Sequence, residues 1–361
     1  MAAMTRAWDV FCRVIDNHGD LGVAWRLSAD LAARGQQVRL WVDDASALAW
    51  MAPHGDPGVQ LVAWTDPAPD LAPADVVVEC FGCDPPQRFV ERMAAMTPAP
   101  VWINLEYLSA EPYVERSHGL PSPVQVAPGR VLEKRFHFPG FTAETGGLLR
   151  EPGLLDARRG FDRDRWLQAQ GIAALPGERL ASLFCYANAA LPALLGMLAA
   201  EPTLLLVTAG VAAGEVDRAL GAMRDRGALR IQKLPYLTQH DYDRLLWACD
   251  LNFVRGEDSF VRAQWAGAPF VWQAYPQRDG AHRVKVDAYL DRFLGGADPA
   301  LAAPLRRLWV AWNASPAAAL PAADPLPAMT AWRARCEAWR DALAAQPDLV
   351  TQLLRYTGHP S

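Results

Sequence analysis

The stretch Asp250-Leu-Asn-Phe-Val-Arg-Gly-Glu-Asp-Ser-Phe260 predicts a buried strand that breaks sharply into a helix. The apolar run from Leu251 to Val254 is typical of a buried strand, and it stops at an Arg-Gly pair. A helical pattern then begins, with Val261 and Trp265 four residues apart. A second apolar run, Phe270 to Tyr275, follows at once. The stretch therefore predicts a strand–loop–helix–strand unit of an α/β fold.

The start of this helix predicts an anion-binding site. Asp258 or Ser259 is expected to cap the first turn, whose bare amides carry a partial positive charge. Arg255 adds a planar guanidinium that suits phosphate oxygens. Glu257 would repel phosphate, so we expect it to accept hydrogen bonds from sugar or ribose hydroxyls, or to cap an amide. The alternative is an ordinary capped helix with solvated charges.

The composition predicts a two-domain protein of the cytoplasm. The chain has 361 residues, 51% of them hydrophobic, which is enough for two cores. No apolar run reaches the length of a membrane span, and Met1 to Trp8 lacks a signal-peptide pattern. A net charge of −5 argues against nucleic acid as the main ligand. Of six cysteines, only Cys80 and Cys83 form a close pair, which predicts ordinary thiols rather than a zinc site.

A second candidate site follows the first strand pattern, Trp8 to Ile15. The loop Asp16-Asn-His-Gly-Asp20-Leu-Gly22 leads into a helical pattern over 23–33. Its two glycines do not make the three-glycine fingerprint of dinucleotide-binding folds, and its carboxylates argue against pyrophosphate as the ligand. Asp20 lies just before a helix at the carboxyl end of a strand, where open α/β sheets bind ligands. Alternatively, Asp16 and Asp20 only end the strand and cap the helix.

Two series of alternating strands and helices predict two domains. We expect one over residues 1–170 and one over 177–344, with a charged, loop-like junction from Glu151 to Arg165. The poorly periodic region from Pro112 to Arg150 is rich in Pro, Gly and aromatic residues, and within it Lys134 to Phe141 could form a strand or hairpin. Long irregular stretches of this kind are often binding loops, here for a macromolecular partner. The helical end, 345–361, is expected to pack back on the first domain.

Several motifs together resemble the protein-arginine rhamnosyltransferases that modify bacterial elongation factor P. The resemblance rests first on the pairing of Asp16-Asn-His-Gly-Asp20-Leu-Gly-Val23 with Arg255-Gly-Glu-Asp-Ser259. The other matching motifs are Trp41-Val-Asp-Asp44, Asn104-Leu-Glu-Tyr107, Phe184-Cys-Tyr186 and Trp272-Gln-Ala-Tyr-Pro-Gln277. The similarity extends over nearly the whole chain and is weakest in the Ala/Pro-rich stretch from Pro299 to Pro327.

The resemblance implies a GT-B glycosyltransferase, an α/β protein whose two Rossmann-like domains face each other across a cleft. The implied reaction moves L-rhamnose from dTDP-β-L-rhamnose to an arginine of elongation factor P, with inversion at the sugar carbon. Elongation factor P and the dTDP-sugar are therefore the expected partners, and neither nucleic acid nor a membrane is expected. No metal or other cofactor is expected, since no Asp-x-Asp motif occupies a convincing position.

The resemblance also assigns residues to the site. Asp20 is the expected catalytic base, Asp16 its support, and Glu257 a further catalytic residue that also lines the donor site. Residues expected to bind the donor are Phe184, Tyr186, Gln239, Phe253, Arg255, Asp258, Ser259 and Phe260. Of these, Phe253 and Phe260 are expected to stack on thymine.

Two alternatives stay open from the residues alone. A GT-B transferase could act on a lipid or glycan acceptor instead of a protein. A nucleotide-sugar-dependent protein could also bind elongation factor P without modifying it. The carboxylates at Asp16 and Asp20 argue against this second alternative, because a mere binder has little need of them opposite the donor.

Overall fold

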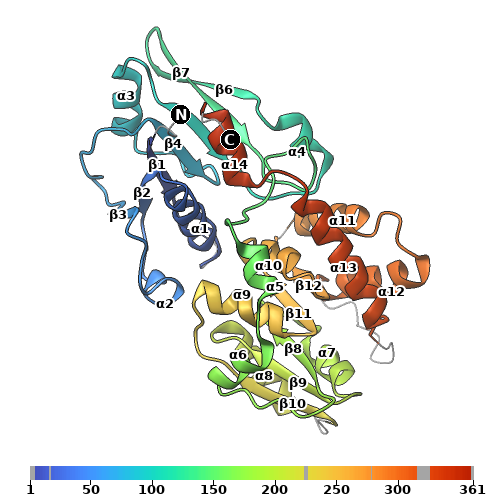
Figure 1. Cartoon of the computed structure of the whole chain (residues 1–361). Helices are drawn as coiled ribbons and strands as arrows, with labels where there is room; N and C mark the ends of the chain where they lie inside the picture. The colour runs from blue at the N-terminus through green and yellow to red at the C-terminus, as the bar shows by residue number, and fades with distance from the viewer. Residues whose placement is uncertain (1–4, 16–17, 223–226, 278, 315–325, 359–361) are drawn as a thin grey trace. The chain divides into compact units, whose positions relative to one another are not determined.

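The chain folds into two compact units. The computed structural model describes residues 5–15, 18–222, 227–277, 279–314 and 326–358. Unit 1 comprises Met1–Pro152 and Leu343–Ser361, and unit 2 comprises Gly153–Ala342 (Figure 1). Residues 153–170, which we expected in the first domain, thus belong to unit 2.

Unit 1 is built on a seven-stranded sheet. Its strands are β1 (Ala7–Cys12), β2 (Gln37–Val42), β3 (Val59–Ala63), β4 (Val76–Cys80), β5 (Val101–Leu105), β6 (Pro121–Ala127) and β7 (Arg130–His137). Its helices are α1 (Gly19–Ala33), α2 (Leu48–Met51), α3 (Gln87–Ala95), α4 (Pro112–Ser117) and α14 (Leu349–Tyr356). The strand order is β3-β2-β1-β4-β5-β7-β6, and only the β6–β7 pair is antiparallel. Parallel neighbours of β1 on both sides explain why it is buried on both faces.

Alternation along β1 supplies a core to each face of this sheet. Trp8 and Val10 join a cluster that includes residues of α1 and α14, whereas Phe11 joins a cluster with Trp41 and Phe89. Successive side chains of a strand point to opposite faces, so one buried strand anchors helices on both. The rings of Phe11 and Trp41 stack with centroids 4.9 Å apart.

The region from 112 to 150 is more regular than we expected. It contains α4 and the β6–β7 hairpin, whose outer strand is the edge of the sheet. Pro121 and Pro123 lie in β6, a placement that edge strands tolerate because one side of their backbone is unpaired. The prolines and the half-exposed side chains of β6 conceal the strand pattern in the sequence. The prediction of an irregular region was therefore wrong for α4 and β6, whereas the strand considered possible from Lys134 overlaps β7.

The last helix of the chain packs on unit 1. Leu349, Val350 and Leu353 of α14 are buried in the same cluster as α1 and β1. The helix that precedes it, α13 (Met329–Ala344), is separated from α14 around Pro347. Only α14 contributes to the unit 1 core.

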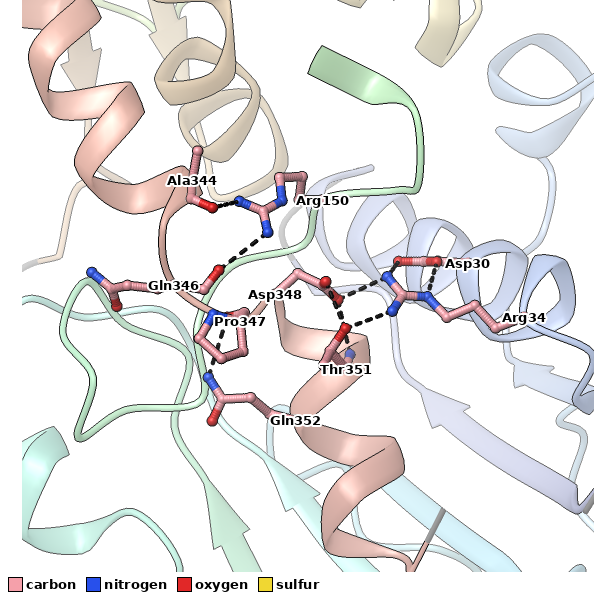
Figure 2. A network of polar contacts seen from close by, with 9 residues as sticks. All are labelled: Asp30, Arg34, Arg150, Ala344, Gln346, Pro347, Asp348, Thr351 and Gln352. Carbon is pink, nitrogen blue, oxygen red and sulfur yellow. Dashed lines mark hydrogen bonds and ion pairs between the residues drawn. The ribbon is translucent and has the colours of Figure 1, made fainter. Parts of the chain in front are cut away.

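Two arginines hold the segment that leads into α14 (Figure 2). The Arg150 guanidinium donates to the carbonyl oxygens of Ala344 and Gln346, at 2.7 and 3.1 Å. Arg34 joins Asp30, at 2.7 Å, to Asp348, at 2.8 Å. Asp348 also caps α14 by accepting from the amide of Thr351 at 2.8 Å. Segments far apart in the sequence are thereby fixed together within unit 1.

Unit 2 is built on a five-stranded parallel sheet. Its strands are β8 (Arg179–Leu183), β9 (Thr203–Val207), β10 (Leu229–Lys233), β11 (Leu251–Arg255) and β12 (Phe270–Gln273). Besides α13, its helices are α5 (Leu154–Arg159), α6 (Arg163–Ala169), α7 (Leu191–Leu198), α8 (Val211–Ala222), α9 (Gln239–Ala248), α10 (Asp258–Ala266), α11 (Ala281–Phe293) and α12 (Pro299–Trp312). The strand order is β10-β9-β8-β11-β12. The chain adds β9 and β10 on one side of β8 and then β11 and β12 on the other side, as in Rossmann-like sheets.

The segment expected to be a loop-like junction contains α5 and the start of α6. Trp166 and Leu167 of α6 are buried in a cluster with residues of β8, β9 and α9. The Arg158 guanidinium of α5 donates to the carbonyl of Ala266 in α10, at 3.3 Å. The many charges made this segment resemble a linker, but its few apolar residues fix it to unit 2.

A buried ion pair joins α9 to α10. The Arg262 guanidinium donates twice to the Asp243 carboxylate, at 2.8 and 2.7 Å, and both side chains are at most 3% exposed. Such pairs are costly to break, because the remaining charge stays buried.

We expect Asp243→Asn to lower the free energy of unfolding of unit 2 by about 3 kcal/mol, since Arg262 keeps its charge and loses the opposite one. Urea unfolding followed by tryptophan fluorescence would measure the change. The matched control is Asp291→Asn, which removes an exposed ion pair with Arg306 and should cost only about 0–1 kcal/mol. Equal losses in the two variants would contradict the prediction.

A buried histidine should make the stability of unit 1 depend on pH. Burial lowers the pKa of His137 in β7 to about 3, with a smaller contribution from His118. Between about pH 6.5 and this value the unfolded chain binds a proton that the native state excludes, so stability falls as pH falls.

We therefore expect His137→Gln to flatten the pH dependence of unfolding in this window, measured by urea denaturation at several pH values. The exposed His54→Gln is the matched control and should keep the wild-type slope. An unchanged slope in His137→Gln would show that other groups cause the dependence.

Candidate functional site

The predicted anion site lies where β11 turns into α10. Gly256 makes the turn with a φ of 64°, a left-handed conformation that glycine adopts without strain. The indole N–H of Trp272 in β12 donates to the Gly256 carbonyl at 2.8 Å. The helix begins at Asp258, and Glu257 occupies the cap position without a capping side-chain bond. The expected cap by Asp258 or Ser259 was therefore wrong.

Ser259 shapes the turn with its own hydroxyl. Its Oγ accepts from the amide of Arg255 at 3.2 Å and donates to the Arg255 carbonyl. The side chain is 4% exposed. Ser259 thus connects the first turn of α10 to the end of β11. This contact fixes the backbone of Arg255, from which its side chain projects.

The Arg255 guanidinium lies close to two aromatic rings. Its Cζ atom is 4.5 Å from the ring centre of Phe184 and 4.3 Å from that of Tyr186, within the range of cation–π attraction. Arg255 is 8% exposed, and its Nη1 is buried without a hydrogen-bond partner among the described residues. Other buried donors, such as Nε of Arg163 and Nε1 of Trp309, also lack a partner among the described residues, so what distinguishes Arg255 is its place beside the first amides of α10. A phosphate oxygen would fit this donor.

The two rings come from the loop that follows β8. The amide of Tyr186 donates to Oε1 of Gln273, at the end of β12, at 2.9 Å. The ring of Tyr275 meets that of Tyr186 edge to face, with centroids 5.4 Å apart. Burial raises the pKa of the intervening Cys185 to about 12, so this thiol stays neutral. The loop therefore offers rings and amides rather than a nucleophile.

Gln239 lies close to Asp258. It is the first residue of α9, whose cap Thr238 accepts from the amide of Asp241. Its Nε2 is 3.5 Å from Oδ2 of Asp258, at the limit of a hydrogen bond. Glu257 and Asp258 are half-buried at the head of α10. The structure thus brings these predicted residues to one end of α10, together with Arg255.

Phe253 and Phe260 lie in the core instead. Phe253 is fully buried, and its ring meets Trp312 edge to face at 5.2 Å. Phe260 is 2% exposed and stacks on Trp272 with centroids 4.1 Å apart. Since protein groups enclose both rings, the expected stacking on thymine is not supported. Phe184 is half-buried, which makes it the better aromatic candidate in this loop region.

A cavity of about 520 Å³ opens elsewhere in unit 2. It is lined by parts of α7, α8, α11 and α12 and by the ends of the loops after β8 and β12. Asn188 and Gln273 are among its lining residues, but none of the predicted donor residues is. The polar side chains of Asn188 and Gln273 in its lining are already bonded to the protein.

Asp20 lies in the first turn of α1 in unit 1, not just before the helix as expected. It is 3% exposed. Its Oδ2 accepts from the amide of Ile15 at 2.9 Å, and its Oδ1 accepts from the hydroxyl of Tyr107 at 3.3 Å. Asp16 lies outside the described residues.

Sequence reasoning missed Tyr107, Phe81 and Gln273 as residues of these sites. Tyr107 and Gln273 stood in motifs that matched the family, but no role was drawn from them. Their position in the sequence could have revealed them, because each lies at or just after the carboxyl end of a parallel strand. Ligands of open α/β sheets bind at that edge.

These groups suggest the chemistry that each unit can perform. An oriented carboxylate can bind a cation and accept a proton, and a buried arginine beside a helix start can hold a diphosphate. Within the described ranges, no group of three or more His, Cys, Asp or Glu residues could hold a metal ion. No helix there is long and apolar enough to cross a membrane.

Comparisons with known proteins show the family of the chain. The family model described as elongation factor P (EF-P) rhamnosyltransferase EarP matches residues 8–358. A protein-arginine rhamnosyltransferase of Pseudomonas aeruginosa is 44% identical, covering 97% of this chain and 98% of the relative. One of Neisseria meningitidis is 35% identical, covering 96% of each.

A solved structure concerned with EarP-mediated arginine glycosylation of EF-P superposes with a TM-score of 0.66, at 34% identity and 98% coverage of both chains. A UDP-glucosyltransferase from Polygonum tinctorium, 11% identical and covering 99% of each chain, superposes with a TM-score of 0.55 and shows the fold alone. The fold is that of GT-B glycosyltransferases, with two Rossmann-like sheets. The chain belongs to the EarP family of EF-P rhamnosyltransferases.

Proposed function

We propose that this chain rhamnosylates an arginine of EF-P by using Arg255 to hold the donor and Asp20 to receive the proton. The chain is a protein-arginine rhamnosyltransferase by family, and EF-P is its acceptor. We infer dTDP-β-L-rhamnose as the donor and inversion at its anomeric carbon. The observation that carries the proposal is the buried Nη1 of Arg255, which lies beside the head of α10 and has no hydrogen-bond partner within the described ranges.

The donor diphosphate would bind at the head of α10. Arg255 supplies a fixed cationic fork, held flat by Phe184 and Tyr186, and the first amides of α10 add partial positive charge. Glu257 and Asp258 have acceptor oxygens for sugar or ribose hydroxyls, with Gln239 beside Asp258. As the sugar leaves, the growing negative charge on the diphosphate would be stabilised by groups already in place.

The acceptor guanidinium would bind at Asp20, with Asp16 as a supporting carboxylate. An arginine has a pKa near 13.8 and a free aspartate near 4, so full proton transfer before attack would cost roughly 13 kcal/mol. We therefore propose that the proton moves late. The carbon–oxygen bond to the diphosphate breaks, the nitrogen bonds to the anomeric carbon, and the nitrogen, acidic only then, gives its proton to Asp20.

The direct test is incubation of the chain with dTDP-L-rhamnose and EF-P, followed by whole-protein mass spectrometry. We expect one added deoxyhexose on EF-P, and none on EF-P whose acceptor arginine is replaced by lysine. Modification of a glycan or lipid in place of EF-P, or binding without modification, would contradict the proposal.

Asp20→Asn should lower turnover by about 10²–10⁴-fold, because the carboxylate that accepts the proton is lost. Binding of dTDP should stay unchanged, since the residues proposed to bind the diphosphate lie in unit 2. Steady-state kinetics and calorimetry would measure the two quantities. The matched control, the exposed Asp70→Asn, should leave both unchanged. Equal loss of turnover and donor binding would make Asp20 a structural residue.

Arg255→Lys should weaken dTDP binding by about ten- to a hundred-fold. It keeps the charge but loses the planar fork that two rings hold flat. Calorimetry measures the affinity, and circular dichroism checks the fold. Arg306→Ala, on the exposed face of α12, is the control and should bind dTDP normally. Normal affinity in Arg255→Ala would rule out the assignment.

A further inference from the structure

The hydroxyl of Tyr107 lies against the carboxylate of Asp20. Tyr107 follows β5, and its hydroxyl donates to Oδ1 of Asp20 at 3.3 Å. The amide of Ile15 donates to Oδ2 at 2.9 Å. Each carboxylate oxygen thus has a donor from the protein, one from a backbone and one from a side chain. A carboxylate held at both oxygens is restricted in its rotation.

Phe81 holds the ring of Tyr107. The two rings stack with centroids 4.2 Å apart and an interplanar angle of 15°. Tyr107 is half-buried, as is Phe81, whose other contacts include the core of β1 and α1. The stack therefore connects the Tyr107 hydroxyl to the core of unit 1.

The backbone of Phe81 is strained. Its φ is 60°, in the left-handed region that residues other than glycine seldom adopt. Its amide donates to the carbonyl of Leu105, the last residue of β5, at 2.7 Å. Strained residues persist where their surroundings fix them, and they cluster at functional sites. Here the strain places the Phe81 ring on Tyr107.

The topology of the sheet explains why these residues meet. In the order β1-β4-β5, neighbouring strands are parallel, so their carboxyl ends share one edge. Cys80 pairs with Leu105 in register, which puts the next residues of both strands side by side. Asp20 enters this edge from the helix that follows β1.

We propose that Tyr107 is a positioning residue for Asp20, and that Phe81 fixes Tyr107 for this task. The inference rests on the proposed role of Asp20. The Tyr107 hydroxyl holds the carboxylate in one orientation while it grips the acceptor guanidinium and takes the proton. The contact of 3.3 Å is longer than an ordinary O–H···O bond, as is common at catalytic groups before substrate binds.

The first test is Tyr107→Phe, which keeps the stack on Phe81 and removes only the hydroxyl. We expect kcat to fall about tenfold or more, the effect of losing a hydrogen bond to a charged group. The affinity for dTDP and the melting temperature should stay at wild-type values. Wild-type kcat would overturn the proposal, as would a matching loss of dTDP affinity or stability.

The second test is a double-mutant cycle with Phe81→Leu. If Phe81 acts through the Tyr107 hydroxyl, Phe81→Leu lowers kcat in the wild type and has little further effect on Tyr107→Phe. Independent, additive losses would overturn this part of the proposal. Tyr356→Phe, on α14, is the matched control for removing a tyrosine hydroxyl from unit 1, and it should keep wild-type kcat.

Asp20→Asn, measured in parallel, separates this inference from the function on which it rests. An inactive Asp20→Asn beside a fully active Tyr107→Phe would overturn the role of Tyr107 alone. Full activity in Asp20→Asn would overturn the proposed role of Asp20 itself, and with it the reason for positioning that residue.

Discussion

A buried arginine close to two aromatic rings is the constraint on which the candidate donor site depends. Burying a cation is costly unless an opposite charge or several hydrogen bonds compensate it. The rings of Phe184 and Tyr186 compensate only in part. Because β8 and β11 are parallel neighbours, the loop carrying both rings must emerge beside Arg255. Sheet pairing thus creates the cation site, and an anionic ligand would complete it.

The same topology places the carboxylate of unit 1. Asp20, Phe81 and Tyr107 are far apart in the sequence, yet each follows one of three adjacent parallel strands. A parallel sheet gathers its functional groups at one edge without any local sequence motif. The price is local backbone strain at Phe81, which the rigid strand ends can hold. In both units the candidate functional groups thus lie at the carboxyl ends of parallel strands, a carboxylate in unit 1 and a guanidinium in unit 2.

This rule also explains what the sequence could and could not predict. The buried strand β11 was predicted within a residue from its mostly apolar run, and so was the turn at Arg255. The edge strand β6 was missed, because its alternation is weak and contains prolines. Phe253 and Phe260 were misassigned because position near a motif does not reveal which face a ring takes in a doubly buried strand or helix. The contact of Tyr107 with Asp20 is long-range, and no local pattern encodes it.

Two buried arginines near α10 differ in how the protein compensates their charge. Arg262 is buried and receives a carboxylate from Asp243 in an ideal two-bond geometry. Arg255 is buried beside the same helix, but its Nη1 has no acceptor among the described residues. The chain can therefore neutralise a buried guanidinium where structure alone requires it. Trp309, Trp312 and Trp332 also have buried indole nitrogens without a partner among the described residues, so an empty donor alone does not indicate a ligand. What favours an anionic ligand at Arg255 is the combination of its charge with its place at the head of α10.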